Sequence, residues 1–439
     1  MRLKTFLYLL ALICFSSVVA SPALAGESPE ALARLAVSDK PAEAGAAIAQ
    51  LRAMGPKGLQ LLLDNHAEEI GQVISGLPLN EQEWQRLSAA LDAVSQQRNS
   101  YASGLYWYTD FDQALAASRA SGKPILSLRL LGKLSEEFSC ANSRFFRTVL
   151  YANSDVASYL REHFILHWKS VRPAPRVTID FGDGRKLERT LTGNSIHYVL
   201  DSSGSLLDAL PGLYGPALFK RGLTRAEGLA KQLQGKNPSE RRVALRAYHD
   251  SRIRAIANDW AVDVAKSGGR VPPDVAARIE QRKAAPGAIE VAPVAITKGI
   301  VEIDILRAIT ADATALEAAT DLSAWNKIAE LHQSDALLDS NSIALMAHQN
   351  PALRADQGLL ARTVKNLEKY MALDAARNEY MLHTKLHAWF VTGMTGAGVE
   401  TLNERVYAQL FLTPSSDPWL GLYLPDAYSA LENGGVSRN

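Results

Sequence analysis

The stretch KPILSLRLL, residues 123–131, decides the fold of the central part of this chain. It begins directly after the turn residues at 121–122. The seven residues from Ile125 to Leu131 form a short run that is mostly apolar. Such a run between turn signals predicts a buried strand. The segment SCANSRFFR, residues 139–147, follows at the point where an irregular loop becomes an amphipathic helix. Its Cys140 is the best candidate for a chemically active residue.

Helices and strands alternate on both sides of these two segments. The patterns predict a helix at 110–120, strands at 125–131 and 164–168, a hairpin over 176–191, strands at 196–200 and 205–210, and a helix at 219–233. Counted with the helix after Cys140, the order is α-β-α-β-insert-β-β-α. This order predicts an α/β domain over residues 105–235.

Several stretches of this domain resemble the thioredoxin-like superfamily, in particular its secreted or periplasmic branch. The stretches that carry the resemblance are FDQAL at 111–115, SGKPIL at 121–126, Cys140, NSDVASYLREHFI at 153–165 and YVLDSSG at 198–204. Together they span about a third of the chain. The resemblance implies a thioredoxin-like core.

The redox site of that family is a C-x-x-C pair at a helix start, where the helix dipole stabilises a thiolate. Here Cys140 takes the first position and Ser143 the second, which gives a degenerate monothiol C-x-x-S variant. The resemblance implies that Cys140 is the nucleophile and that Ser143 donates a hydrogen bond to the thiolate. Without a resolving thiol, dithiol oxidoreductase turnover by the mature chain alone is excluded.

The resemblance also implies a groove wall opposite Cys140, formed by Ser195 and Ile196. Ile196 stands where the family carries a cis-proline. Because a cis bond before a residue other than proline costs about 3 kcal/mol, we expect a trans peptide and an altered groove. Three interpretations of Cys140 stay open at this point: a buried inert cysteine, a reactive monothiol and a metal ligand.

The first 25 residues have the pattern of a secretory signal peptide. Arg2 and Lys4 form the basic region, residues 6–19 the apolar region, and residues 23–25 a small-x-small cleavage site. We therefore expect a periplasmic or secreted protein that begins near Gly26. Cleavage removes the only other cysteine, so the mature chain has no intramolecular disulfide.

Both flanks of the central domain have helical periodicity. Residues 26–104 predict a helical region, either HEAT-like helix pairs or a small helical cap. Residues 236–294 predict a helical segment followed by a Pro/Ala-rich linker at 284–294. Residues 295–439 predict a helical C-terminal domain or a helical extension that wraps the central one.

One constellation in the C-terminal region has metal-ligand spacing. Glu379, His383 and His387 lie four residues apart and so share one helical face. The pattern differs from H-E-x-x-H, and we interpret it as a solvated or partly buried polar face rather than as a metal site. No phosphate-binding loop, nucleophile elbow or dinucleotide fingerprint occurs, so the sequence predicts no cofactor.

The charge balance restricts the partners. There are 47 Lys and Arg residues against 46 Asp and Glu, without a basic tail, so nucleic acid is not expected as a partner. After signal cleavage no apolar segment is long enough for an integral membrane protein. Two hypotheses follow. In the first, the chain performs monothiol thiol-disulfide exchange or thiol-dependent binding in the cell envelope; in the second, it is a non-catalytic thioredoxin-fold scaffold whose helical flanks bind a protein partner.

Overall fold

The computed structural model describes residues 27–277 and 313–419, apart from 78, 192 and 397, together with 430, 433 and 436. The predicted signal peptide at 1–25 and the predicted linker at 284–294 lie outside the described residues.

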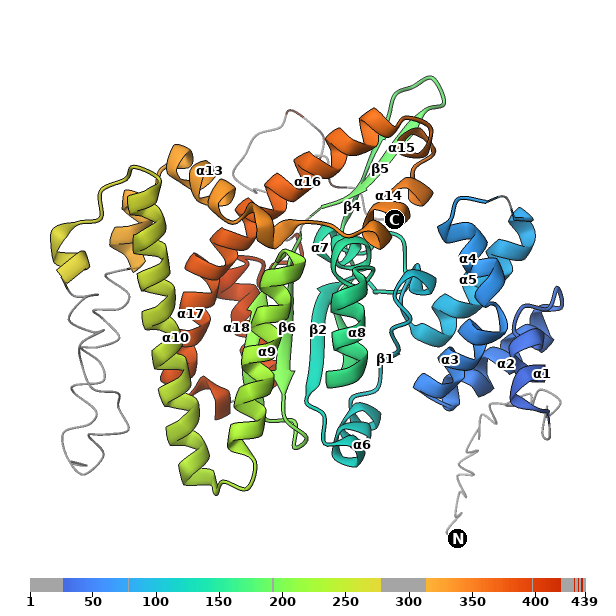
Figure 1. The fold of residues 1–439 in the computed structure, drawn as a ribbon, viewed down its shortest axis with the longest axis horizontal. Helices are drawn as coiled ribbons and strands as arrows, with labels where there is room; N and C mark the ends of the chain where they lie inside the picture. Colours follow the sequence, from blue (N-terminus) through green and yellow to red (C-terminus); the bar gives the residue numbers. More distant parts are fainter. Residues whose placement is uncertain are drawn as a thin grey trace, which may run out of the picture.

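A five-stranded mixed sheet forms the centre of the molecule (Figure 1). Its strands are β1 (Trp107–Tyr108), β2 (Ile125–Leu131), β3 (Ile165–Arg172), β6 (Ser195–Leu200) and β7 (Leu206–Pro211), in the order β1-β3-β2-β6-β7. β1, β3 and β2 run parallel, whereas β6 is antiparallel to β2 and β7 antiparallel to β6. Every residue of β2, β6 and β7 is buried, which explains their mostly apolar sequences. The predicted α/β architecture is confirmed at this level.

Helices cover both faces of the sheet. They are α6 (Phe111–Ser121), α7 (Ala141–Phe145), which continues as the π-helical turn η2 (Phe146–Leu150), α8 (Ser154–His163) and α9 (Pro216–Leu233). On one face the ring of Phe111 in α6 contacts His167 of β3. On the other face the ring of His197 in β6 contacts Phe146 of η2 and Phe219 of α9. The sheet is therefore the middle layer of three.

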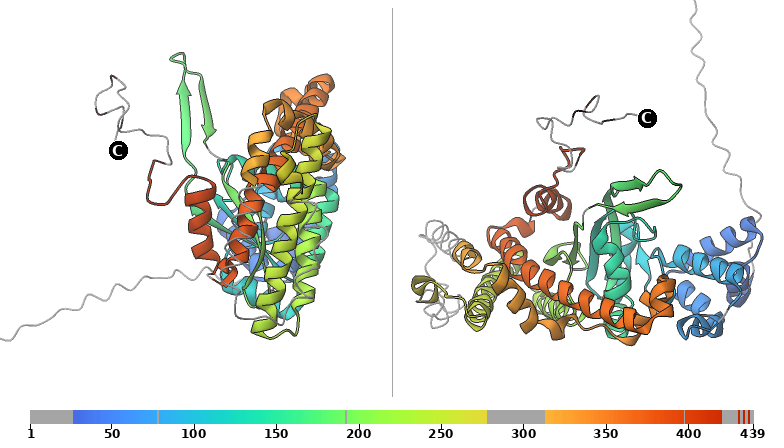
Figure 2. Two further views of the ribbon diagram at one scale, coloured as in Figure 1. Left: turned by 90° about the vertical axis from the view of Figure 1, so that its left-hand side faces the viewer. Right: turned by 90° about the horizontal axis from the view of Figure 1, so that it is seen from above.

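Short polar residues begin the predicted helices. The Asp110 side chain accepts from the backbone N–H of Gln113 at the start of α6, and Asn153 accepts from Val156 at the start of α8. The predicted hairpin is also present, as β4 (Arg176–Asp180) paired with β5 (Lys186–Thr190). It projects from the body as a separate two-stranded ribbon (Figure 2).

The N-terminal helices form a separate layer with its own core. They are α1 (Pro29–Leu35), α2 (Pro41–Ala53), α3 (Pro56–Asn65), α4 (Ala67–Ile74) and α5 (Glu81–Ser95), followed by the short 3-10 turn η1 (Ser100–Ala102). Their apolar side chains form one cluster that reaches Tyr106, Ala152 and Leu345 outside these helices. The N-terminal helices thus pack against both the central domain and the C-terminal region.

The C-terminal helices contribute to the same core as the sheet. They are α10 (Pro238–Lys266), α13 (Leu322–Leu331), η3 (Gln333–Ala336), α14 (Ser340–Gln349), α15 (Pro351–Ala355), α16 (Gln357–Arg377), η4 (Asn378–His383), α17 (Thr384–Val391), η5 (Met394–Gly396), α18 (Val399–Arg405) and η6 (Val406–Leu410). Buried Leu386, Phe390, Leu402 and Tyr407 belong to the apolar cluster that the strands form. Among the described helices, none is long and apolar enough to cross a bilayer.

Candidate functional site

Cys140 lies at the N-terminal end of α7, as the sequence predicts, but its side chain is inside the protein. Cys140 is 0% exposed and belongs to the apolar core around the sheet. Its backbone N–H donates to the carbonyl of Leu131 at the end of β2, 3.0 Å away. A reagent or substrate disulfide in solution therefore does not reach the thiol without an opening of the fold.

Ser143 is buried one turn further along α7. Its hydroxyl oxygen lies 2.8 Å from the carbonyl oxygen of Cys140 and 2.7 Å from the hydroxyl of Ser139. These contacts fix the start of the helix. A hydrogen bond from Ser143 to a Cys140 thiolate stays a prediction.

The loop before β6 lies beside the start of α7, as the resemblance implies. A Cβ added to Gly193 would lie 2.9 Å from Oδ1 of Asn142 in α7. Ser195 and Ile196 are both fully buried, and no described peptide bond is cis, so the bond between them is trans as expected. The structure therefore brings the four residues predicted for a thiol site to one region, but in the interior.

The C-terminal region closes this site from outside. The Tyr407 hydroxyl in η6 donates to the carbonyl of Asn194, 3.1 Å away, and the Asn194 amide donates to the hydroxyl of Thr413. Burial, with a smaller contribution from nearby Cys140, holds the pKa of Tyr407 well above its usual value. Tyr407 of η6 and Thr413 thus cover the loop that faces Cys140.

A groove of about 600 Å³ opens beside α7, where all three regions of the chain meet. Its walls include Trp84 and Tyr101 from the N-terminal region, Arg144 and Phe145 from α7, and Met346 and His348 from α14. Phe145 is 39% exposed although its ring is large and apolar. In the described part of the chain, Nε of Arg144 is buried without a hydrogen-bond partner. The groove therefore offers both an apolar and a cationic contact.

A second site lies on the other side of the domain, around the three residues with metal-ligand spacing. Glu379, His383 and His387 are all buried, so of the two polar faces considered, solvated or partly buried, the solvated one does not apply. Oε2 of Glu379 lies 2.8 Å from Nδ1 of His383. Nδ1 of His387 lies 2.9 Å from Nδ1 of His249 in α10.

Asp208 of β7 completes this cluster. Its Oδ1 lies 3.5 Å from Nε2 of His383 and 3.9 Å from Nδ1 of His387, while Tyr248 donates to its Oδ2 at 2.5 Å. Sequence reasoning missed Asp208, although an acid inside the apolar strand LLDALP was a usable signal. It also missed His249, because nothing local pairs position 249 with position 387.

The charges of this cluster compensate one another. Burial alone would lower the pKa of His383, but the carboxylates of Glu379 and Asp208 outweigh it and raise that pKa to about 9. Burial alone would raise the pKa of Glu379, but His383 and Arg252 outweigh it and lower that pKa to about 2. Two carboxylates therefore lie beside a cationic imidazole in the interior.

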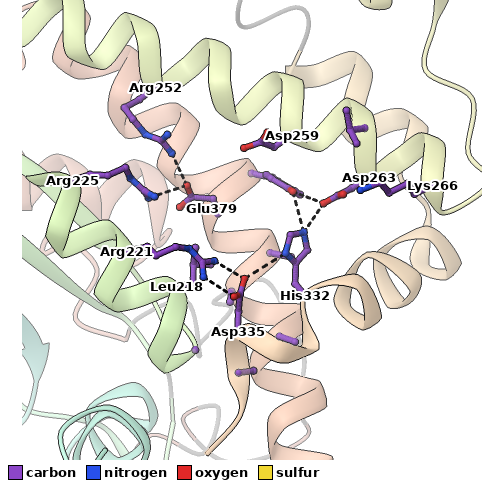
Figure 3. A pocket seen from close by; sticks show the side chains of 17 residues that line it. Leu218, Arg221, Arg225, Arg252, Asp259, Asp263, Lys266, His332, Asp335 and Glu379 are labelled. Atoms are coloured by element: carbon purple, nitrogen blue, oxygen red, sulfur yellow. Dashed lines mark hydrogen bonds and ion pairs between the residues drawn. The ribbon is translucent and has the colours of Figure 1, made fainter. Parts of the chain in front are cut away.

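A cavity of about 270 Å³ adjoins the cluster and shares Glu379 with it (Figure 3). Arg225 and Arg252 both point at Glu379, and the Arg221 guanidinium pairs with Asp335. His332 lies between Asp335 and Asp263. The contact with Asp263 makes the larger contribution and the contact with Asp335 the next, and together they raise the pKa of His332 to about 9. The cavity has both polar and apolar walls, and the charged groups named here are paired across it.

Comparison with known proteins gives no assignment: no family model, curated protein or solved structure matches this chain.

Proposed function

We propose that this protein is an exported scaffold with a thioredoxin-like core, whose helical flanks bind a segment of a protein partner in the groove beside α7. The observation that carries the proposal is the groove itself, which is built from the N-terminal helices, α7 and α14 together. Burial of Cys140 supports binding without thiol chemistry as the principal activity. The succession of strands and helices across β2 to α9 supports the thioredoxin-like core.

The groove fits a peptide with an aromatic or large aliphatic anchor next to a carboxylate. Phe145, Trp84 and Met346 supply apolar contact area for such an anchor. The groove lining has three arginines against two carboxylates, and one of those arginines, Arg144, has an unpaired buried Nε that a carboxylate would satisfy.

Peptide selection tests this proposal. A random peptide library displayed against the intact protein should yield sequences with an aromatic or aliphatic anchor beside Asp or Glu. Phe145→Asp and Arg144→Glu should each weaken a selected peptide at least about tenfold, measured by fluorescence anisotropy. Phe181→Asp is the matched control, because Phe181 is 54% exposed on the hairpin and outside the groove. Equal binding by all three variants would contradict the proposal.

Alkylation of Cys140 separates the scaffold from monothiol exchange. A small thiol reagent should label Cys140 only after denaturation. Rapid labelling of the native protein, with an apparent pKa well below the ~8.5 of a free cysteine, would favour monothiol exchange instead. Export is tested independently by the N-terminal mass of the mature protein, which should begin near Gly26.

A further inference from the structure

Three buried histidines share an unusual property. In the part of the chain that the structure describes, Nε2 of His249, His383 and His387 has no hydrogen-bond partner. Each of these residues is at most 1% exposed. A buried polar atom without a partner costs about 1–3 kcal/mol. Of these three atoms, Nε2 of His383 is the one that faces Asp208, 3.5 Å from its Oδ1.

We propose that Asp208, His383 and His387 form a zinc-binding site. One possible ligand atom from each of the three lies within 4.8 Å of the other two. In a tetrahedral zinc site with bonds of 2.0–2.1 Å, neighbouring ligand atoms are about 3.3 Å apart. Oδ1 of Asp208 is 3.5 Å from Nε2 of His383 and 3.9 Å from Nδ1 of His387. Small side-chain rotations bring these atoms into range.

The groups around the three ligands are placed as supports of a metal site. Glu379 accepts from Nδ1 of His383, which fixes the ring and leaves Nε2 to face Asp208. Tyr248 and the backbone N–H of Ala209 both donate to Asp208, each to a different carboxylate oxygen. A carboxylate that orients a ligand histidine is the usual outer shell of protein zinc sites.

His249 is the residue best placed to become a fourth ligand beside Asp208, His383 and His387. Its Nδ1 lies 2.9 Å from Nδ1 of His387, so one of the two nitrogens must carry the proton of this contact. Rotation of His249 would make it a fourth ligand, and otherwise a water molecule takes that position. The site is closed by protein on the side of β7 and approaches the 270 Å³ cavity at Glu379.

The donor set restricts the metal to transition ions. Two imidazoles with one carboxylate suit zinc and its first-row neighbours, whereas magnesium and calcium favour sites made of oxygen alone. Asp208 brings one negative charge to a divalent ion. Arg225 and Arg252 pair with Glu379 from the cavity side.

Metal content of the untagged full-length protein tests the site. After treatment with a chelator, dialysis and addition of one equivalent of zinc, elemental analysis should find one zinc per chain. Cobalt(II) added in place of zinc should give the intense visible absorption of a four-coordinate ion, a readout that needs no mutation. Absence of both signals in the folded protein would overturn the proposal.

Variants locate the ion. His383→Gln and Asp208→Asn should each abolish stoichiometric zinc binding, with folding checked by circular dichroism. Tyr248→Phe retains all ligands and should weaken zinc about tenfold, as expected for an outer-shell group. His66→Gln is the control, because His66 is a histidine of the separate N-terminal core region. Stoichiometric zinc in Tyr248→Phe and His383→Gln at unchanged affinity would refute this assignment.

Discussion

Replacement of His332 by Gln should reduce stability in a manner that depends on pH. The His332 imidazole contacts Asp263 at 2.5 Å and Asp335 at 3.6 Å, and these contacts raise its pKa from 6.5 to about 9. Taken at face value, this difference corresponds to about 3 kcal/mol. The side chain is 33% exposed, so solvent screening reduces the expected contribution to about 1–2 kcal/mol.

The direction of the pH dependence follows from the raised pKa of His332. Below about pH 6.5 the imidazole is protonated in both the folded and the unfolded chain, and the ion pairs contribute fully. As the pH rises through about 9, the folded protein loses that proton and the contribution disappears. The stability difference between wild type and His332→Gln should therefore shrink between pH 6 and pH 10.

Urea unfolding at several pH values measures this difference, and histidine side-chain NMR measures the pKa of His332 directly. His348→Gln is a matched comparison, because burial lowers the pKa of His348 and its effect has the opposite sign. Because the folded protein holds His348 neutral, the wild type should lose stability relative to His348→Gln as the pH falls below about 6.5. A constant difference for His332→Gln from pH 6 to pH 10, or an NMR pKa near 6.5, would refute the ion-pair interpretation.

Two further predictions concern packing and the connection of the C-terminal helices. Gly58→Ala should destabilise by about 1–3 kcal/mol in thermal unfolding, because its Cβ would lie 1.9 Å from the Leu51 carbonyl oxygen. By contrast, Gly71→Ala, with nothing within 4 Å of its Cβ, should stabilise by about 0.5–1 kcal/mol. Glu400→Gln should cost about 1–3 kcal/mol in urea unfolding because it removes the negative charge that pairs with buried Arg129. The same loss at high salt and at low salt would speak against an ionic cause.

Local patterns predicted the central domain well because each element there satisfies its own requirements. The apolar run at 125–131 is buried throughout, and the Asp110 side chain caps the helix that was expected to begin beside it. The hairpin at 176–190 follows from two strands around a glycine-containing turn. β1 was not predicted as a strand, because two residues at a sheet edge carry no periodic signal.

The two sites were harder to predict because they depend on contacts between distant parts of the chain. The sequence left open whether Cys140 is buried or reactive, because Tyr407 and Thr413 bond to the facing loop from more than 200 residues away. Glu379, His383 and His387 were visible as a helical face. Their burial and their contact with Asp208 depend on β7 packing against that face, which spacing alone does not encode.

The C-terminal helices determine the character of both sites. Without η6, the loop at 193–196 would lose the hydrogen bond of Tyr407, and the start of α7 would lose part of its cover. Without η4 and α17, the Asp208 carboxylate in an apolar strand would lose His383 and His387, which is costly. The described helices after residue 377 therefore belong to the same folded unit as the central sheet. The sheet depends on them to bury Cys140 and to balance the charge of Asp208. The sheet and the helices after residue 377 thus form one packed unit.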